Sequence, residues 1–128
     1  MNRREARKLA MTIIYTADFN TISIENAAKM VLENEDQTID YFLDCVKDNL
    51  TKIDELITIS LTNYSIGRLN LVDKAIIRLA TGEMLKGDTD RKIIINEALE
   101  LTKEYSDQGD HKAVSFNNRL LDSISKNI

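Results

Sequence analysis

Apolar residues recur along almost the whole chain with a period close to 3.6, which is the period of an α-helix. The chain has no proline and only four glycines, so few residues force a helix to stop. No alternation of apolar and polar residues is long enough for a β-sheet. A length of 128 residues suits one buried core and is too short for two independent ones. The sequence therefore predicts an all-α fold in which residues 1–128 form a single helical domain.

About seven helices are expected, joined by short loops. The first predicted helix covers residues 3–17, and the second begins at a cap on Ser23 and ends before a break at 34–37. Helical patterns follow over 38–63 and over 71–86, where Gly87 is the stop. The last two helices run from a cap within 88–90 to Tyr105 and over 112–126. Residues 38–63 fit one bent helix or two, and we favour two divided near 49–51. Residues 93–95 alone also fit a β-strand, but the helical pattern around them favours a helix.

Positive charge is concentrated at the start of the chain. Four cations and one acid give residues 1–8 a local charge of +3, whereas the whole chain carries −4. The other 120 residues therefore carry −7. A basic patch on an acidic body can hold RNA phosphates locally without binding polyanions over its whole surface.

The same cations share one side of the first predicted helix. At about 100° per residue they fall in an arc of about 140° that points away from the apolar stripe. The members of this arc are Arg3, Arg4, Arg7, Lys8, Met11 and Tyr15. Cations at a helix N-terminus oppose the helix dipole, so this arrangement favours an anionic ligand, although an ordinary solvated helix end stays open. Arginine suits phosphate, and a tyrosine can stack on an unpaired base.

Enzymatic chemistry has little support. Cys45 and His111 are the only residues of their kinds, so a four-ligand zinc site is excluded, and no glycine-rich phosphate loop occurs. A hydrolase built on Asp107 and Asp110 has neither a metal nor a raised-pKa environment to support it. We therefore expect no catalytic residue, no metal and no cofactor. Cys45 fits a buried thiol of a cytoplasmic protein, and no apolar run is long enough to cross a membrane.

Three polar residues stand inside or beside apolar helical segments. Arg78 is expected to pair with an acid such as Glu83 or Glu97. Glu97 is expected to tie neighbouring helices together. Asp73 is placed on the side of its helix away from the core, either as a first-turn acid or as an anchor for a basic partner.

Several motifs, in order and spacing, resemble those of the NusB family over nearly the whole chain. They are Arg4-x-Ala6-Arg7-x-x-Ala10 followed by Tyr15, Asn63-Tyr64-Ser65-Ile66-Gly67-Arg68-Leu69, Val72-Asp73-Lys74-Ala75-Ile76-Ile77-Arg78 and Ile95-Asn96-Glu97-Ala98-Leu99-Glu100-Leu101. Each motif is weak alone, and their combination carries the resemblance. Tyr64 stands where the family has Trp. Arg119 and Asn117 stand where the family has a small and an apolar residue, so local packing there can differ or Arg119 can add a phosphate contact.

The resemblance implies two packed helical sub-bundles, roughly the first three helices and the last four, and no catalysis. It implies a transcription antitermination factor that binds boxA-type RNA of ribosomal RNA leaders with the ribosomal protein NusE, within the antitermination complex of RNA polymerase. By motif position Arg3, Arg4, Arg7, Lys8 and the helix start at Lys112 would contact RNA. Tyr15 and Asp73 would lie at the partner surface. A homodimer, and a protein-interaction module without specific RNA recognition, stay open as alternatives.

Overall fold

The computed structural model describes residues 1–128 and contains seven α-helices, one short 3₁₀ helix and no strand. The helices are α1 (Arg3–Asn20), α2 (Ile24–Val31), α3 (Gln37–Lys47), α4 (Leu50–Ser60), α5 (Leu71–Lys86), α6 (Arg91–Tyr105) and α7 (Lys112–Asn127), with the 3₁₀ helix η1 (Ile66–Arg68) before α5. The all-α prediction is confirmed. Residues 93–95 lie inside α6 and form no strand.

Local capping sets most helix ends. The Ser23 hydroxyl accepts a hydrogen bond from the Asn26 amide at 3.0 Å, and Gly87 ends α5 in the left-handed conformation with φ 78°. The segment 38–63 is divided at 48–49, so the favoured reading of two helices is confirmed. The first helix runs three residues further than predicted. Its last residue, Asn20, donates a side-chain hydrogen bond to the carbonyl of Thr16, and this bond supports the added turn.

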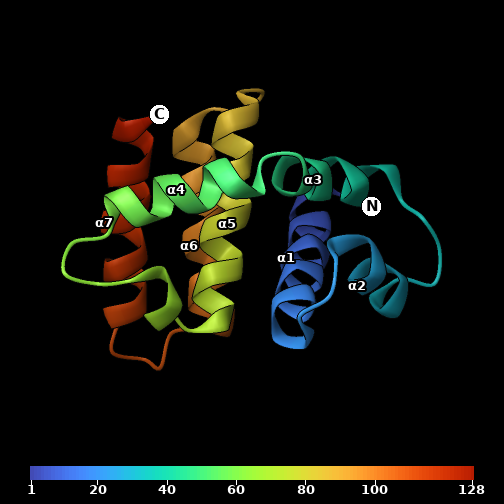
Figure 1. The fold of residues 1–128 in the computed structure, drawn as a ribbon, viewed down its shortest axis with the longest axis horizontal. Helices are drawn as coiled ribbons and strands as arrows, with labels where there is room; N and C mark the ends of the chain where they lie inside the picture. Colours follow the sequence, from blue (N-terminus) through green and yellow to red (C-terminus); the bar gives the residue numbers. More distant parts are fainter.

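The helices form two groups that meet at α5. Figure 1 shows α1, α2 and α3 on one side of the molecule and α4, α6 and α7 on the other. α5 packs against α1 and α3 of the first group and against α4, α6 and α7 of the second. This arrangement confirms the two packed sub-bundles, and it makes α5 the shared wall between them.

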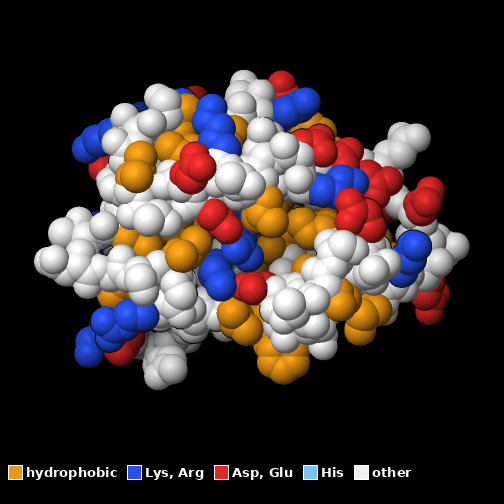
Figure 2. Space-filling model, in the orientation of Figure 1, with side chains coloured by type: hydrophobic (Ala, Val, Ile, Leu, Met, Phe, Trp, Pro, Cys, Tyr) orange, Lys and Arg blue, Asp and Glu red, His pale blue; other side chains and the backbone are white.

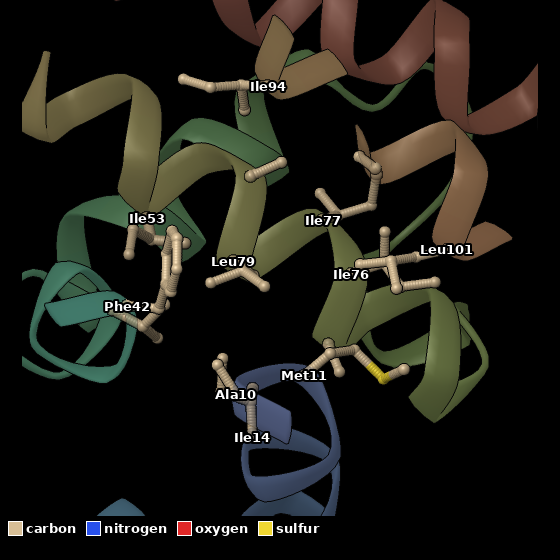
Figure 3. Packing of buried hydrophobic residues seen from close by; sticks show 14 of the residues in the cluster. Ala10, Met11, Ile14, Phe42, Ile53, Ile76, Ile77, Leu79, Ile94 and Leu101 are labelled. Carbon is tan, nitrogen blue, oxygen red and sulfur yellow. The ribbon is translucent and has the colours of Figure 1, made fainter. Parts of the chain in front are cut away.

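One hydrophobic core runs through both groups. It joins buried apolar side chains of α1 to α7, and Figure 3 shows Phe42 of α3, Leu79 of α5 and Ile14 of α1 among the residues that meet at its centre. Met11 is 4% exposed and belongs to this core. The prediction that placed Met11 on the outward basic arc was therefore wrong, because α3 and α5 cover α1 over a wider face than the apolar stripe alone indicates.

Ion pairs cross the junction between the two groups. Arg78 of α5 makes two hydrogen bonds of 2.9 Å to the Asp54 carboxylate of α4 and lies 3.5 Å from Asp18 of α1. Lys74 Nζ lies 3.0 Å from the same Asp18 carboxylate. Figure 2 shows a small group of charged side chains surrounded by hydrophobic atoms in the middle of this face. The expected Arg78 partners, Glu83 and Glu97, were wrong, because each of those acids pairs with α1 instead.

Candidate nucleic-acid interface

Arg3 is exposed at the start of α1 and is held in place without a carboxylate partner. Its guanidinium lies 5.3 Å from the ring centroid of Tyr41 and 5.0 Å from that of Phe42, both on α3. It also donates a hydrogen bond of 3.2 Å to the Thr89 hydroxyl in the loop before α6. The aromatic contacts orient the cation and leave its charge free to meet an anion.

Arg4 and Lys8 pair with acids of α6 yet stay accessible. Arg4 makes a bidentate contact to Glu97, at 3.1 and 3.0 Å, and 65% of its side chain is exposed. Lys8 lies 3.1 Å from Glu104, and 38% of its side chain is exposed. The hydrogen bonds that Arg4 donates to Glu97 raise the pKa of Arg4, and the one that Lys8 donates to Glu104 raises the pKa of Lys8, so both remain cations. We name Arg3, Arg4 and Lys8 the basic edge.

A shallow hollow of about 280 Å³ lies beside the basic edge, between α1 and α6. Its lining is almost entirely charged, with one apolar residue, Leu101. α1 contributes three cations, and α6 contributes three acids and one lysine: Arg4, Arg7, Lys8, Glu97, Glu100, Glu104 and Lys103. Such a lining suits a charged ligand that exchanges partners with the protein's own ion pairs.

Arg7 lines the hollow but does not belong to the basic edge. It is 5% exposed and makes two hydrogen bonds, 3.0 and 2.8 Å, to the buried carboxylate of Glu83 on α5. Its guanidinium also lies 4.9 Å from the Phe42 ring. The prediction of an outward-facing Arg7 was wrong, because α5 brings an acid against that side of α1. Arg7 fixes the position of α1 while its neighbours face solvent.

Lys112 is exposed but lies apart from the basic edge. α1 and α6 run side by side in the same direction, since Arg4 meets Glu97 and Lys8 meets Glu104. Lys112 begins α7 after the loop that follows α6, and it is therefore at the end where α1 and α6 finish. The structure does not bring it together with Arg3 and Arg4.

A second, apolar hollow of about 350 Å³ lies at that finishing end. Tyr15 and Phe19 stack there with ring centroids 5.9 Å apart, and Tyr105 of α6 and the start of α5 complete it. Phe19 is 63% exposed and Tyr105 is 46% exposed. The family resemblance implied Tyr15 at a partner surface, and Phe19 was not singled out, although its spacing of four residues from Tyr15 could have indicated it.

Asp73 is a buried connector rather than a surface anchor. It is 8% exposed, and its carboxylate accepts hydrogen bonds from Asn70 at 2.7 Å, Ser106 at 2.7 Å and Asn117 at 3.0 Å. The prediction that Asp73 faces away from the core was wrong. Asn117, which is fully buried, also donates to Thr102 at 3.1 Å. A polar residue at position 117 thus joins α7 to α5 and α6 behind the apolar hollow.

The remaining polar residues show capping and turn contacts. Asp107 accepts a hydrogen bond from the Gly109 amide, and Asp110 accepts one from the Lys112 amide. The His111 imidazole is 79% exposed and lies 4.0 Å from Asp107. No three residues of the types His, Cys, Asp and Glu gather as a metal ion would require, and no helix is long and apolar enough to span a membrane.

Both the sequence and the fold of the chain match those of known proteins of one family. Residues 4–126 match the model of the NusB family. The transcription antitermination protein NusB of Macrococcus caseolyticus is 34% identical over 131 residues, covering 99% of this chain and 98% of the relative. The NusB structure from T. maritima superposes with a TM-score of 0.86 at 28% identity, covering 98% of this chain and 92% of that one.

A further solved structure is described as the antitermination factors NusB and NusE in complex with double-stranded RNA. It superposes with a TM-score of 0.82 at 27% identity and covers 98% of this chain and 97% of that one.

Proposed function

The chain belongs to the NusB family, a family of antitermination factors and not of enzymes, and on that premise we propose that it acts with NusE on boxA-type RNA of ribosomal RNA leaders. In this role it helps RNA polymerase, in the cytoplasm, to read through terminators. The solved complex of a similar NusB with NusE and RNA supports the choice of partners. The comparisons lend no support to a homodimer.

The observation that carries the proposal is the exposure of the basic edge. Arg3 has no carboxylate partner, and Arg4 keeps 65% of its side chain in solvent although it pairs with Glu97. Exposed ion pairs contribute only about 0–1 kcal/mol, so an RNA phosphate can replace Glu97 at little cost. Phosphate also accepts the same two-pronged contact from arginine.

Salt dependence of RNA binding tests the basic edge. With NusE present, three phosphate contacts at the basic edge contribute about −2 to the log–log slope of affinity against salt for a single strand. Replacing Arg3 and Arg4 by Gln should make the slope shallower by about 1.4. Lys126→Gln, a change at an exposed cation near the end of α7, serves as the control and should leave the slope unchanged. An unchanged slope in the double variant would remove these residues from the interface.

Glu97→Gln provides the opposite change at the same place. It frees Arg4 from its carboxylate partner, so RNA affinity at low salt should rise about two- to fivefold, as expected for loss of a surface ion pair. If the Arg4–Glu97 contact only supports packing, Glu97→Gln should not raise RNA affinity. The same assay measures both variants, and a fall in affinity for Glu97→Gln would contradict competition between the acid and RNA.

We assign the NusE contact to the apolar hollow of Tyr15, Phe19 and Tyr105. Exposed aromatic residues at a surface hollow are typical anchors of protein interfaces. Asp73 supports this surface indirectly, because it holds Asn70 and Ser106, which line the hollow. Phe19→Ser should weaken binding of purified NusE at least tenfold while RNA binding by the chain alone stays unchanged.

A second candidate is a protein-interaction module without specific RNA recognition. The acids that pair with Arg4 and Lys8 favour it, because they lower the net positive charge of the basic edge. Competition by a scrambled RNA separates the two candidates. Equal competition by scrambled and boxA-type strands, with NusE bound, would support the second.

A further inference from the structure

Three cations outside the basic edge lack any carboxylate partner. Arg68 in η1 and both Lys112 and Arg119 on α7 are exposed and form no ion pair, whereas Lys126 near the end of α7 pairs with Asp122. Lys112 and Arg119 are seven residues apart and therefore share one face of α7. Figure 2 shows Lys and Arg side chains at the lower left, where α7 begins, with an acidic side chain beside them.

Two aromatic rings link Arg68 to α7. The Arg68 guanidinium lies 5.1 Å from the ring centroid of Tyr64, and that ring lies 5.6 Å from Phe116 at a tilt of 58°. The Tyr64 hydroxyl donates to the Arg68 carbonyl at 3.1 Å, which fixes the loop before α5. Tyr64 is 39% exposed, so part of its ring faces solvent.

A hollow of about 280 Å³ opens beside the aromatic pair. Phe116, Arg119 and three hydroxyl-bearing residues, Ser60, Thr62 and Ser123, are among its lining, and no carboxylate lines it. On a chain with a net charge of −4, a hollow lined by an unpaired arginine and hydroxyl groups but by no carboxylate favours an anion. The adjoining rings add a surface on which a base can stack.

We propose that this surface is a second site for single-stranded RNA, with Arg68 and Arg119 on phosphates and Tyr64 and Phe116 against a base. The proposal rests on the RNA-binding function proposed above and extends it to a place remote from the basic edge. Lys112, which lies outside the basic edge, adds a third cation to this second site. An RNA strand long enough to pass both places is then held at two points.

The double variant Arg68→Gln/Arg119→Gln tests the phosphate contacts. With a labelled single-stranded RNA of about 20 nucleotides, loss of two contacts should reduce the log–log salt slope by about 1.4. Arg68→Lys/Arg119→Lys keeps the charge and should keep the slope, and circular dichroism checks that each variant is folded. If the Gln variant binds with wild-type slope while Arg3→Gln/Arg4→Gln does not, this second site is overturned and the proposed function stands.

Substitution of Tyr64 tests the stacking. Tyr64→Ala should weaken RNA binding about tenfold, within the range reported for loss of one stacked base, whereas Tyr64→Phe keeps the ring and should bind as the wild type does. RNA carrying 4-thiouridine should crosslink to the peptide that contains Tyr64 or Phe116. Crosslinks confined to α1, or equal competition by polyglutamate and by unlabelled RNA at this site, would overturn the proposal in favour of the basic edge alone or of an acidic protein partner.

Discussion

At the scale of single residues, the contact between Arg7 and Glu83 decides which cations of α1 are exposed, and helical periodicity alone could not predict it. The sequence places Arg7 on the basic side of α1 with its three neighbouring cations, and only the fold reveals that Glu83, 76 positions later, meets it. A charge that is 5% exposed must be paired, because removing an ion from water costs several kcal/mol. The exposure of three of the four cations could thus be predicted from sequence, whereas the burial of the fourth depends on a distant acid.

The Arg7–Glu83 pair should prove essential to stability. Glu83→Gln leaves the guanidinium buried without its counter-charge, so the free energy of unfolding should fall by about 3–5 kcal/mol. Urea denaturation followed by circular dichroism measures the change. The double variant Arg7→Met/Glu83→Leu removes both charges and should recover most of that loss. A single-variant loss below about 1 kcal/mol would show that the pair is solvated in solution.

Cys45 gives the chain a pH-dependent stability. Burial, with a smaller effect of the nearby Glu83 carboxylate, raises the pKa of the Cys45 thiol from 9.0 to about 11. The folded state then holds this proton more tightly than the unfolded state. The resulting stability is present below pH 9 and is lost as the pH rises toward 11.

The loss reaches at most about 2–3 kcal/mol. Cys45→Ala should reduce this alkaline loss, as measured by urea unfolding at pH 8 and pH 10.5. Burial also raises the pKa of Tyr41 to about 12, so part of the pH dependence should remain in the variant. An identical decline in variant and wild type would exclude the thiol as its source.

At the scale of elements, most of the helices could be predicted, because their ends depend on neighbouring residues. Ser23, Gly87 and Asp90 cap or stop helices through contacts within three or four positions, and these are visible in the sequence. Which residues of each helix face the core could be predicted less well. Leu50 fits the inward pattern yet is 36% exposed, because the helix breaks at 48–49 and Leu50 begins α4 rather than continuing α3.

Gly82 sets how closely α3 and α5 approach each other. A Cβ atom at this position would lie 2.7 Å from the carbonyl oxygen of Cys45 and 3.2 Å from a methyl of Val46. Because the first neighbour is backbone, the two helices would have to separate. We expect Gly82→Ala to cost about 1–3 kcal/mol of unfolding free energy.

Thermal denaturation of Gly82→Ala measures this cost. Gly67→Ala is the matched control, since a Cβ atom there meets nothing within 4 Å and φ is not positive. If the two variants melt alike, the close approach of α3 and α5 has no energetic consequence.

At the scale of the whole molecule, the family resemblance implies two sub-bundles but not the way they are joined. The link depends on α5, which contributes Glu83 toward α1 and Arg78 toward both α4 and α1. These partners are far apart in sequence, and nothing in the local pattern selects Asp18 and Asp54 over other acids. The same applies to the candidate interfaces, where Tyr15 meets Tyr105 and Tyr64 meets Phe116 only after folding.

This shared wall predicts that both sub-bundles unfold together. The core is continuous from α1 to α7, and ion pairs from α5 reach across the junction to Arg7 and Asp18, so separating the halves would expose apolar surface and unpair buried charge. A chain that is one domain should show a calorimetric enthalpy equal to the van't Hoff enthalpy. Amide hydrogen exchange should show equal maximal protection in α1, α3 and α5. Loss of protection in α1 to α3 at lower denaturant than in α5 to α7 would instead show that the sub-bundles are separate folding units, and Arg78→Met, which weakens the junction, should move the chain toward that behaviour.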